Sequence, residues 1–158
     1  GNKMVGGSSY TTDKTSELEK MYYFVAINSD VEWNFANFNS ENENLSVLLT
    51  SHNLIGVSNK YLVQLMDNNP GLTMTKKSHS HQLNSLTKDR DLATPSGFDS
   101  NDDHGDRINY SRFKDKYGDR IPYTFELFVA AQPTQIINYN DSYIFRNSYE
   151  VKDSLIKK

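Results

Sequence analysis

Segments with helical periodicity alternate along the chain with segments of strand character, and this order limits the possible fold more than any other feature. Helical spacing of apolar residues occurs at 16–28, 58–68 and 106–117. Strand-like patterns occur at 31–38, 45–50, 72–77, 123–131, 136–139 and 143–145. The order predicts an α/β or α+β fold, in which helices cover the faces of a sheet.

The first helix is predicted to have one apolar face. Its apolar positions i, i+3, i+4, i+7 and i+8 are Leu18, Met21, Tyr22, Val25 and Ala26. These positions share one side of a helix, so we expect their side chains to be buried.

The length and composition of the chain suit one domain with one hydrophobic core. Of its 158 residues, 36% are hydrophobic and 12% are aromatic, which is enough apolar material for a packed interior. We therefore expect a single domain from residue 15 to residue 158. The Gly- and Ser-rich start, residues 1–14, has the composition of a linker or a cloning remnant, as in a piece cut from a larger polypeptide.

The composition also excludes or disfavours several kinds of site. The chain has no cysteine, so it has no disulfides, no thiolate ligands and no cysteine nucleophile. Its net charge is -3 and it lacks a dense Lys/Arg cluster, which argues against a nucleic-acid partner. No apolar run approaches the roughly 20 residues of a membrane helix, so we expect no membrane partner. No signal peptide is visible, and we expect a larger protein to carry the domain.

A His-x-His pair is the main candidate for a chemical site. The chain has four histidines, which are His52, His79, His81 and His104. Two of them form His79-Ser80-His81 directly after a predicted strand. In an extended segment, residues i and i+2 point to the same side, so both imidazoles could bind one metal ion. His pairs are also common in polar surface segments, and the pair alone leaves both interpretations open.

Carboxylates elsewhere in the sequence could complete such a site. Catalytic zinc has three protein ligands and one open position for water. The polar segment after the His-x-His pair offers Asp99, Asp102, Asp103, Asp106 and His104. Glu32, beside Trp33 at the start of a predicted strand, could accept the proton of the water. Taken one at a time, these residues could equally be solvated side chains.

Taken together, these residues resemble the JAMM motif of the JAB/MPN family. That motif consists of a glutamate, followed tens of residues later by His-x-His, a serine and an aspartate. The matching positions here are Glu32, His79, His81, Ser96 and an aspartate. The stretches that resemble JAB-like toxin domains, found at the C termini of Rhs-type polymorphic toxins of Bacteroidetes, are 31–33, 50–52, 78–81 and 94–98. The resemblance covers roughly residues 15 to 150.

The resemblance implies a mixed β-sheet flanked by helices and a zinc site with separate roles for its residues. His79, His81 and the aspartate would bind Zn²⁺. Glu32 would act as the general acid/base, and Ser96 would stabilise the tetrahedral oxyanion by hydrogen bonding.

The aspartate has two candidates, and the chain departs from the family pattern in two places. Asp99 satisfies Ser-x-x-Asp literally, whereas Asp106 directly precedes a predicted helix, as the aspartate of the family does; Asp106 is preferred. The family usually has Pro after the second histidine, where this chain has Gln82. The interval from His81 to Ser96 is also longer than in the compact motif, so an insertion must be assumed.

The leading functional hypothesis is a zinc-dependent peptidase or isopeptidase that acts as a bacterial toxin. The resemblance implies delivery as part of a larger toxin, a protein substrate in the target-cell cytoplasm and a cognate immunity protein. One alternative is a metal-free JAMM-like protein-binding module, which the departure at Gln82 keeps open. Another is a metal-dependent nuclease toxin, against which the absence of a basic patch counts.

Overall fold

The computed structural model describes residues 2–4, 8–12, 14–50, 59–81, 94–98, 105–130 and 134–145. Its helices are α1 (Thr15–Asn28), α2 (Lys60–Asn68) and α3 (Asp106–Tyr117), and α3 is followed by a 3-10 turn at Gly118–Arg120. Its strands are β1 (Asn2–Met4), β2 (Ser8–Thr12), β3 (Asn34–Asn39), β4 (Asn44–Thr50), β5 (Thr73–His81), β6 (Phe125–Val129), β7 (Gln135–Tyr139) and β8 (Ile144–Phe145). No helix within these ranges has both the length and the apolar character needed to cross a membrane.

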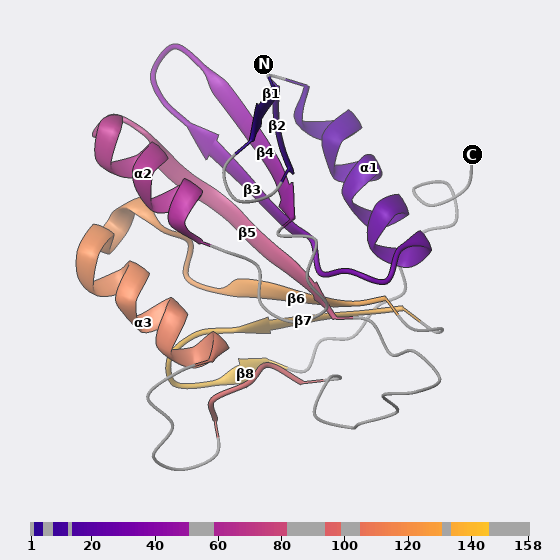
Figure 1. Cartoon of the computed structure of the whole chain (residues 1–158). Helices are drawn as coiled ribbons and strands as arrows, with labels where there is room; N and C mark the ends of the chain where they lie inside the picture. Colours follow the sequence, from indigo (N-terminus) through magenta and orange to yellow (C-terminus); the bar gives the residue numbers. More distant parts are fainter. Residues whose placement is uncertain are drawn as a thin grey trace.

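The strands form one mixed sheet. Its order is β1-β2-β4-β3-β5-β6-β7-β8 (Figure 1). Neighbouring strands are antiparallel, except for β5 and β6, which run parallel. The predicted α+β fold, with a mixed sheet and helices on its faces, is therefore confirmed.

Helices cover both faces of the sheet and divide the core into two layers. α1 packs on one face, and α2 and α3 cover the other (Figure 1). The buried side chains of α1 in its layer are Leu18, Tyr22, Tyr23 and Ala26. Those of α2 and α3 are Leu62, Met66, Tyr110, Phe113 and Tyr117. Because side chains alternate along a strand, the adjacent residues Leu127 and Phe128 of β6 belong to different layers.

The buried face of α1 differs from the predicted one. Met21, which was expected to be buried, is 49% exposed, whereas Tyr23 is 2% exposed. The ring of Tyr23 contacts Phe128 edge-on, with centroids 4.9 Å apart. Apolar spacing identifies a stripe along a helix. How the helix is rotated about its axis, and so which residues face the sheet, depends on the large side chains that pack between helix and sheet.

Residues 1–14, predicted to be a linker, contribute two strands to the sheet instead. β1 and β2 pair with each other, and β2 pairs with β4 from Ser8 opposite Thr50 to Thr12 opposite Ser46. The Gly and Ser content of this stretch obscured the Tyr and Thr residues of β2, which strands favour. The backbone of β4 supplies the pairing partner, and that partner is visible only in the tertiary structure.

The parallel pairing of β5 with β6 determines where the N terminus of α3 lies. A parallel pair needs a crossover connection, and α3 lies in the segment between these two strands. A crossover helix runs back antiparallel to its strands, so the N terminus of α3 comes to the C-terminal end of β5. Ligands of open α/β sheets commonly bind at that end of the strands.

We predict that Phe128→Ala lowers the free energy of unfolding by about 3–5 kcal/mol. Phe128 is fully buried between α1 and the sheet and contacts the rings of Tyr22 and Tyr23, so its loss leaves a cavity there. Urea unfolding followed by circular dichroism measures the change. Met21→Ala, at an exposed position of α1, is the control and should alter stability by less than about 0.5 kcal/mol. Equal losses in the two variants would contradict the assigned faces of α1.

Candidate metal centre

His79 and His81 lie on the same face of β5, the face that α2 and α3 cover. Both belong to the strand itself, which continues to His81 instead of ending at Lys77 as its pattern predicted. Each histidine is 7% exposed, and their ring centroids are 5.0 Å apart. The two-residue spacing within a strand therefore places both imidazoles together in a buried position.

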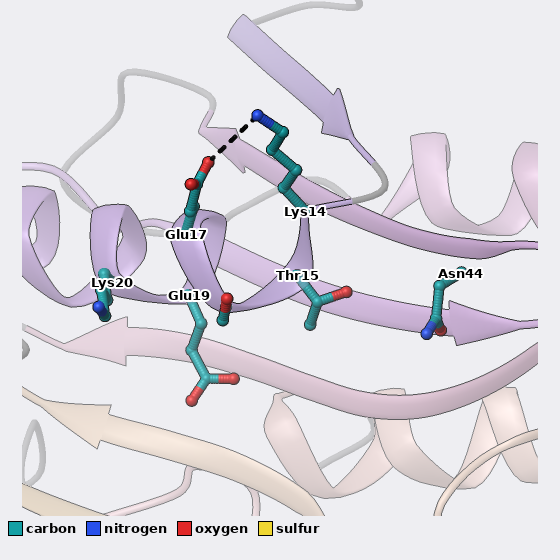
Figure 2. A pocket seen from close by; sticks show the side chains of 7 residues that line it. Lys14, Thr15, Glu17, Glu19, Lys20 and Asn44 are labelled. Carbon is teal, nitrogen blue, oxygen red and sulfur yellow. Dashed lines mark ion pairs between the residues drawn. The ribbon is translucent and has the colours of Figure 1, made fainter.

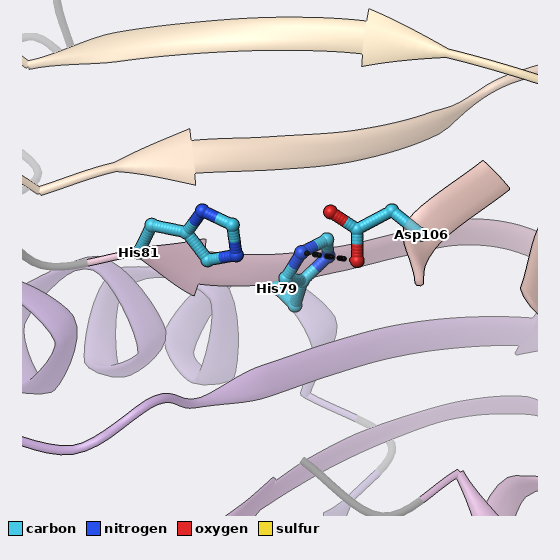
Figure 3. Close-up of side chains that lie close together, drawn as sticks. All are labelled: His79, His81 and Asp106. Carbon is cyan, nitrogen blue, oxygen red and sulfur yellow. Dashed lines mark ion pairs between the residues drawn. The ribbon is translucent and has the colours of Figure 1, made fainter. Parts of the chain in front are cut away.

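Asp106, the first residue of α3, joins the two histidines (Figure 3). Its Oδ1 atom lies 3.2 Å from Nε2 of His79. One possible ligand atom from each of His79, His81 and Asp106 lies within 4.8 Å of the other two. The structure thus brings together the three residues that were predicted to bind zinc, and their role as ligands stays a prediction.

A reciprocal pair of hydrogen bonds with Ser96 holds Asp106 in place. The backbone N–H of Ser96 donates to Oδ2 of Asp106 at 2.8 Å, and the backbone N–H of Asp106 donates to Oγ of Ser96 at 2.9 Å. The second bond satisfies one of the free N–H groups at the start of α3, which is the role of an N-cap. Because Oδ2 is bound to the backbone, Oδ1 is left facing His79.

Gly105 allows Ser96 to approach the start of α3 so closely. Its φ angle is 103°, in a region that favours glycine because it has no Cβ. A Cβ atom at this position would lie only 2.9 Å from Oγ of Ser96. Glycine is therefore required here both for backbone conformation and for space.

Burial and charge act in opposite directions on the carboxyl group of Asp106. Burial raises its pKa, but the imidazole of His79, together with His81 and the N–H of Ser96, outweighs that effect and holds the pKa of Asp106 well below its usual range. The N terminus of α3 also favours a negative charge. Asp106 is therefore ionised, which is the form that binds cations.

Glu32 is buried beside His81, whereas Asp106 lies beside His79. Its Oε1 atom lies 3.5 Å from Nε2 of His81, and the residue is 7% exposed. Trp33 and Ser80 connect this segment to β5: the N–H of Trp33 donates to Oγ of Ser80, and the N–H of Ser80 donates to the carbonyl of Trp33, both at 2.9 Å. These bonds extend the β3–β5 pairing by one residue and place Glu32 next to His81.

The donor atoms fit a tetrahedral metal ion such as zinc. Nε2 of His79 is buried and has no hydrogen-bond partner in the described structure, although Oδ1 of Asp106 lies 3.2 Å away. Two ligands held at about 2.1 Å from a tetrahedral zinc ion are about 3.4 Å apart. The observed 3.2 Å between these two atoms is close to that separation. Two imidazoles and one carboxylate are also a common donor set of catalytic zinc.

Lys77 adds a buried amine on the same face of β5, two residues before His79. It is 4% exposed, and its Nζ atom lies 5.0 Å and 5.7 Å from the ring centroids of Phe125 and Phe113. Burial lowers the pKa of Lys77 to about 8, while the carboxylate of Asp106 partly opposes this shift. A buried amine therefore lies on the face of β5 that carries the two histidines, and no sequence signal distinguished it from a surface lysine.

Ser96 makes a contact that the sequence did not predict. It is exposed, and its Oγ accepts the hydrogen bond from Asp106, so it positions a predicted ligand. The hydroxyl still has its own proton to donate, so this contact is compatible with the predicted role in stabilising an oxyanion. That role stays a prediction. The alternative ligand Asp99 lies outside the described residues, as do His52 and His104.

Asn34 is a polar residue of this region that the sequence interpretation missed. It is 1% exposed and lies directly opposite His79 in the β3–β5 register. A usable signal was present, because Asn34 follows Glu32 by two residues and an extended segment points both to the same side.

A separate hollow of about 660 Å³ lies at the N terminus of α1 (Figure 2). Its lining residues are Lys14, Thr15, Ser16, Glu17, Glu19, Lys20 and Asn44. Lys14 and Glu17 form an exposed ion pair at 4.0 Å across its rim. The hollow combines charges of both signs and includes none of the predicted site residues, so we place the functional site at the histidines.

Comparison with known proteins gives one family match. Residues 10–111 match the family model described as JAB-like toxin 1. The matched range includes Glu32, His79, His81, Ser96 and Asp106. No match was found among curated proteins.

We predict that Ser96→Ala lowers the free energy of unfolding by about 1 kcal/mol, because the backbone N–H of Asp106 at the start of α3 loses its acceptor. It should also weaken zinc binding, because Asp106 loses a contact that positions it. Urea unfolding and isothermal titration with zinc chloride measure the two effects. Ser111→Ala, in the middle of α3, is the control and should leave zinc affinity unchanged. Unchanged zinc affinity in Ser96→Ala, with only turnover reduced, would show that Ser96 acts on the substrate and does not position Asp106.

Proposed function

Because the chain belongs to the JAB-like toxin 1 family, we propose that it is a zinc-dependent hydrolase that cleaves peptide or isopeptide bonds and acts as a bacterial toxin domain. One observation carries the proposal. His79, His81 and Asp106 place their ligand atoms within 4.8 Å of one another, and the carboxylate of Glu32 lies 3.5 Å from His81. Three ligands and a separate carboxylate are the components that a hydrolytic zinc site requires.

Zinc is the metal that suits this set of donors. His79 would bind it through Nε2, His81 through an imidazole nitrogen and Asp106 through Oδ1, which leaves one position open. When bound, the ion supplies the Lewis acidity that makes water a nucleophile near neutral pH. The protein keeps Asp106 ionised, and the carboxylate is the form that binds a metal ion.

Glu32 would carry the proton. Its carboxylate accepts a proton from the attacking water and donates it to the amine as the C–N bond breaks, so the products are a carboxylic acid and an amine. Burial and the contact with His81 hold the carboxylate in one position. A fixed carboxylate lowers the entropic cost of each proton transfer.

Ser96 would contact the substrate while it holds Asp106. Its Oγ accepts the N–H of Asp106, so its own proton can be donated to the carbonyl oxygen as that oxygen gains negative charge. Ser96 is exposed, whereas the histidines are buried, so it can reach a substrate that enters from solvent.

We further propose that the domain works in the cytoplasm of a target cell after delivery as part of a larger toxin, and that a cognate immunity protein protects the producer. Membership of a toxin family supports this. A chain without cysteine needs no oxidising compartment to fold, which suits the cytoplasm. The net charge of -3 favours a protein substrate over nucleic acid.

We predict that Glu32→Gln keeps zinc but loses hydrolysis, whereas His79→Ala loses zinc. The amide of glutamine cannot accept the proton, so the rate should fall by about 10²–10⁴-fold. Mass spectrometry of metal content, after purification without chelators, measures zinc. New protein N termini in a treated bacterial extract, detected by mass spectrometry, measure hydrolysis.

Glu43→Gln is the matched control for this experiment, because Glu43 is an exposed glutamate outside the site. It should keep both zinc and hydrolysis. A native protein that binds no zinc would contradict the proposed function. Zinc loss in Glu32→Gln as complete as in His79→Ala would make Glu32 a ligand.

We predict that the native domain arrests growth when expressed inside a susceptible bacterium, and that His79→Ala and Glu32→Gln do not. Growth curves and proteome-wide quantification should show arrest together with the loss of specific proteins. Equal arrest by all three versions would reject metal-dependent catalysis as the cause. Harmlessness of all three would favour a binding module, and loss of nucleic acid without loss of proteins would favour a nuclease.

A further inference from the structure

The two histidines of the candidate centre each face a polar residue of the neighbouring chain segment. In the β3–β5 pair, Asn34 lies directly opposite His79. One step further, beyond the Trp33–Ser80 hydrogen bonds, Glu32 lies beside His81. Directly opposite residues of antiparallel strands have Cβ atoms about 4.5–5.5 Å apart on the same face. The pattern Glu-x-Asn is therefore aligned against His-x-His, and only its glutamate has a role in the proposed function.

Half of the Asn34 side chain is paired and half is not. Its Nδ2 atom donates a hydrogen bond to Oδ1 of Asn59 at 3.1 Å, which orients the amide. Its own Oδ1 atom is buried and has no hydrogen-bond partner in the described structure. Buried polar atoms are nearly always paired, so an unpaired acceptor at this position requires an explanation. The other buried side-chain atom in this condition is Nε2 of His79, on the residue opposite.

We propose that Asn34 is a positioning residue for the metal ligand His79: when the metal is bound, its amide oxygen, which has no partner in the described structure, accepts the ring N–H of Nδ1 and leaves the lone pair of Nε2 for the metal. This inference rests on the proposed metal site. It adds a residue outside the ligand set, on a different strand from the ligand that it positions.

The chemistry of imidazole is the reason for such a partner. A neutral ring carries one proton, and only the other nitrogen can bind a metal. Metal-binding histidines therefore donate their second ring N–H to an acceptor that selects the tautomer and the ring orientation. In His79, Nε2 faces Asp106, so Nδ1 is the second nitrogen. Nδ1 is bonded to the ring carbon next to Cβ, in the residue that lies directly opposite Asn34.

A purely structural role for Asn34 would use only the Nδ2 atom of its amide. The bond from Nδ2 to Asn59 connects β3 to the residue before α2, and it could serve to hold α2 on the sheet. That role explains neither the buried Oδ1 atom nor its place opposite His79. The two roles also predict different outcomes when each half of the side chain is removed.

Three variants separate the two roles. Asn34→Leu has a similar volume and no acceptor, and it should lower zinc affinity by about 10–100-fold. Asn34→Asp keeps an acceptor in the same place, and its affinity should stay close to native. Asn59→Ala is the matched control, because it removes the partner of Nδ2 and leaves Oδ1 of Asn34; it should lose little affinity. Competition of zinc with a chromophoric chelator measures each affinity, and near-ultraviolet circular dichroism verifies folding.

The NMR spectrum of the zinc-loaded native protein gives a second, independent result. We expect the His79 ring proton on Nδ1 to be visible and protected from exchange, and to be lost in Asn34→Leu. Zinc affinity of Asn34→Leu equal to native, or equal losses in Asn34→Leu and Asn59→Ala, would overturn the inference and leave the metal site intact. A proton on Nε2 in the zinc-loaded native protein would overturn it even if Asn34→Leu failed to fold. Failure of the native protein to bind zinc would instead overturn the proposed function on which the inference rests.

Discussion

The antiparallel pairing of β3 with β5 is the contact on which the candidate site depends. Its register puts Asn34 opposite His79 and, one step beyond the strand, Glu32 beside His81. Side chains alternate between the two faces of a sheet, so a shift of one residue would move one set of these side chains to the α1 face. The hydrogen bonds of the pair thus help to set the distance between the side chains of Glu32 and His81.

The third candidate ligand, Asp106, reaches the site through the connection between β5 and its parallel neighbour β6. The connection from β5 to β6 includes α3, whose N terminus returns to the end of β5 and brings Asp106 to His79. Two hydrogen bonds with Ser96 hold Asp106 at this end of the helix, and Gly105 leaves the space that Ser96 needs. The candidate centre therefore combines a strand, which carries two candidate ligands, with the start of a helix, which carries one.

The site destabilises the fold, because it buries polar groups that are not fully paired. Each unpaired buried donor or acceptor costs about 1–3 kcal/mol, and both Asn34 and His79 carry one in the described structure. The buried amine of Lys77 lies on the same face. Two apolar layers, one under α1 and one under α2 and α3, offset these costs. Metal binding would stabilise the folded state further, since the unfolded chain has no assembled site.

The sequence by itself determined the order of the elements from α1 onward, the α+β class and four of the residues that meet at the centre, which are Glu32, His79, His81 and Asp106. Periodicity shows which segments form helices and strands, and the two-residue spacing of His79 and His81 places them on one face in any strand. Only the tertiary structure decided that residues 8–12 pair with β4, that Tyr23 and not Met21 is buried, and that Asn34 faces a histidine. Spacing along one segment is a local property, whereas register, helix rotation and partner choice depend on residues far away in the sequence, and only packing brings those residues together.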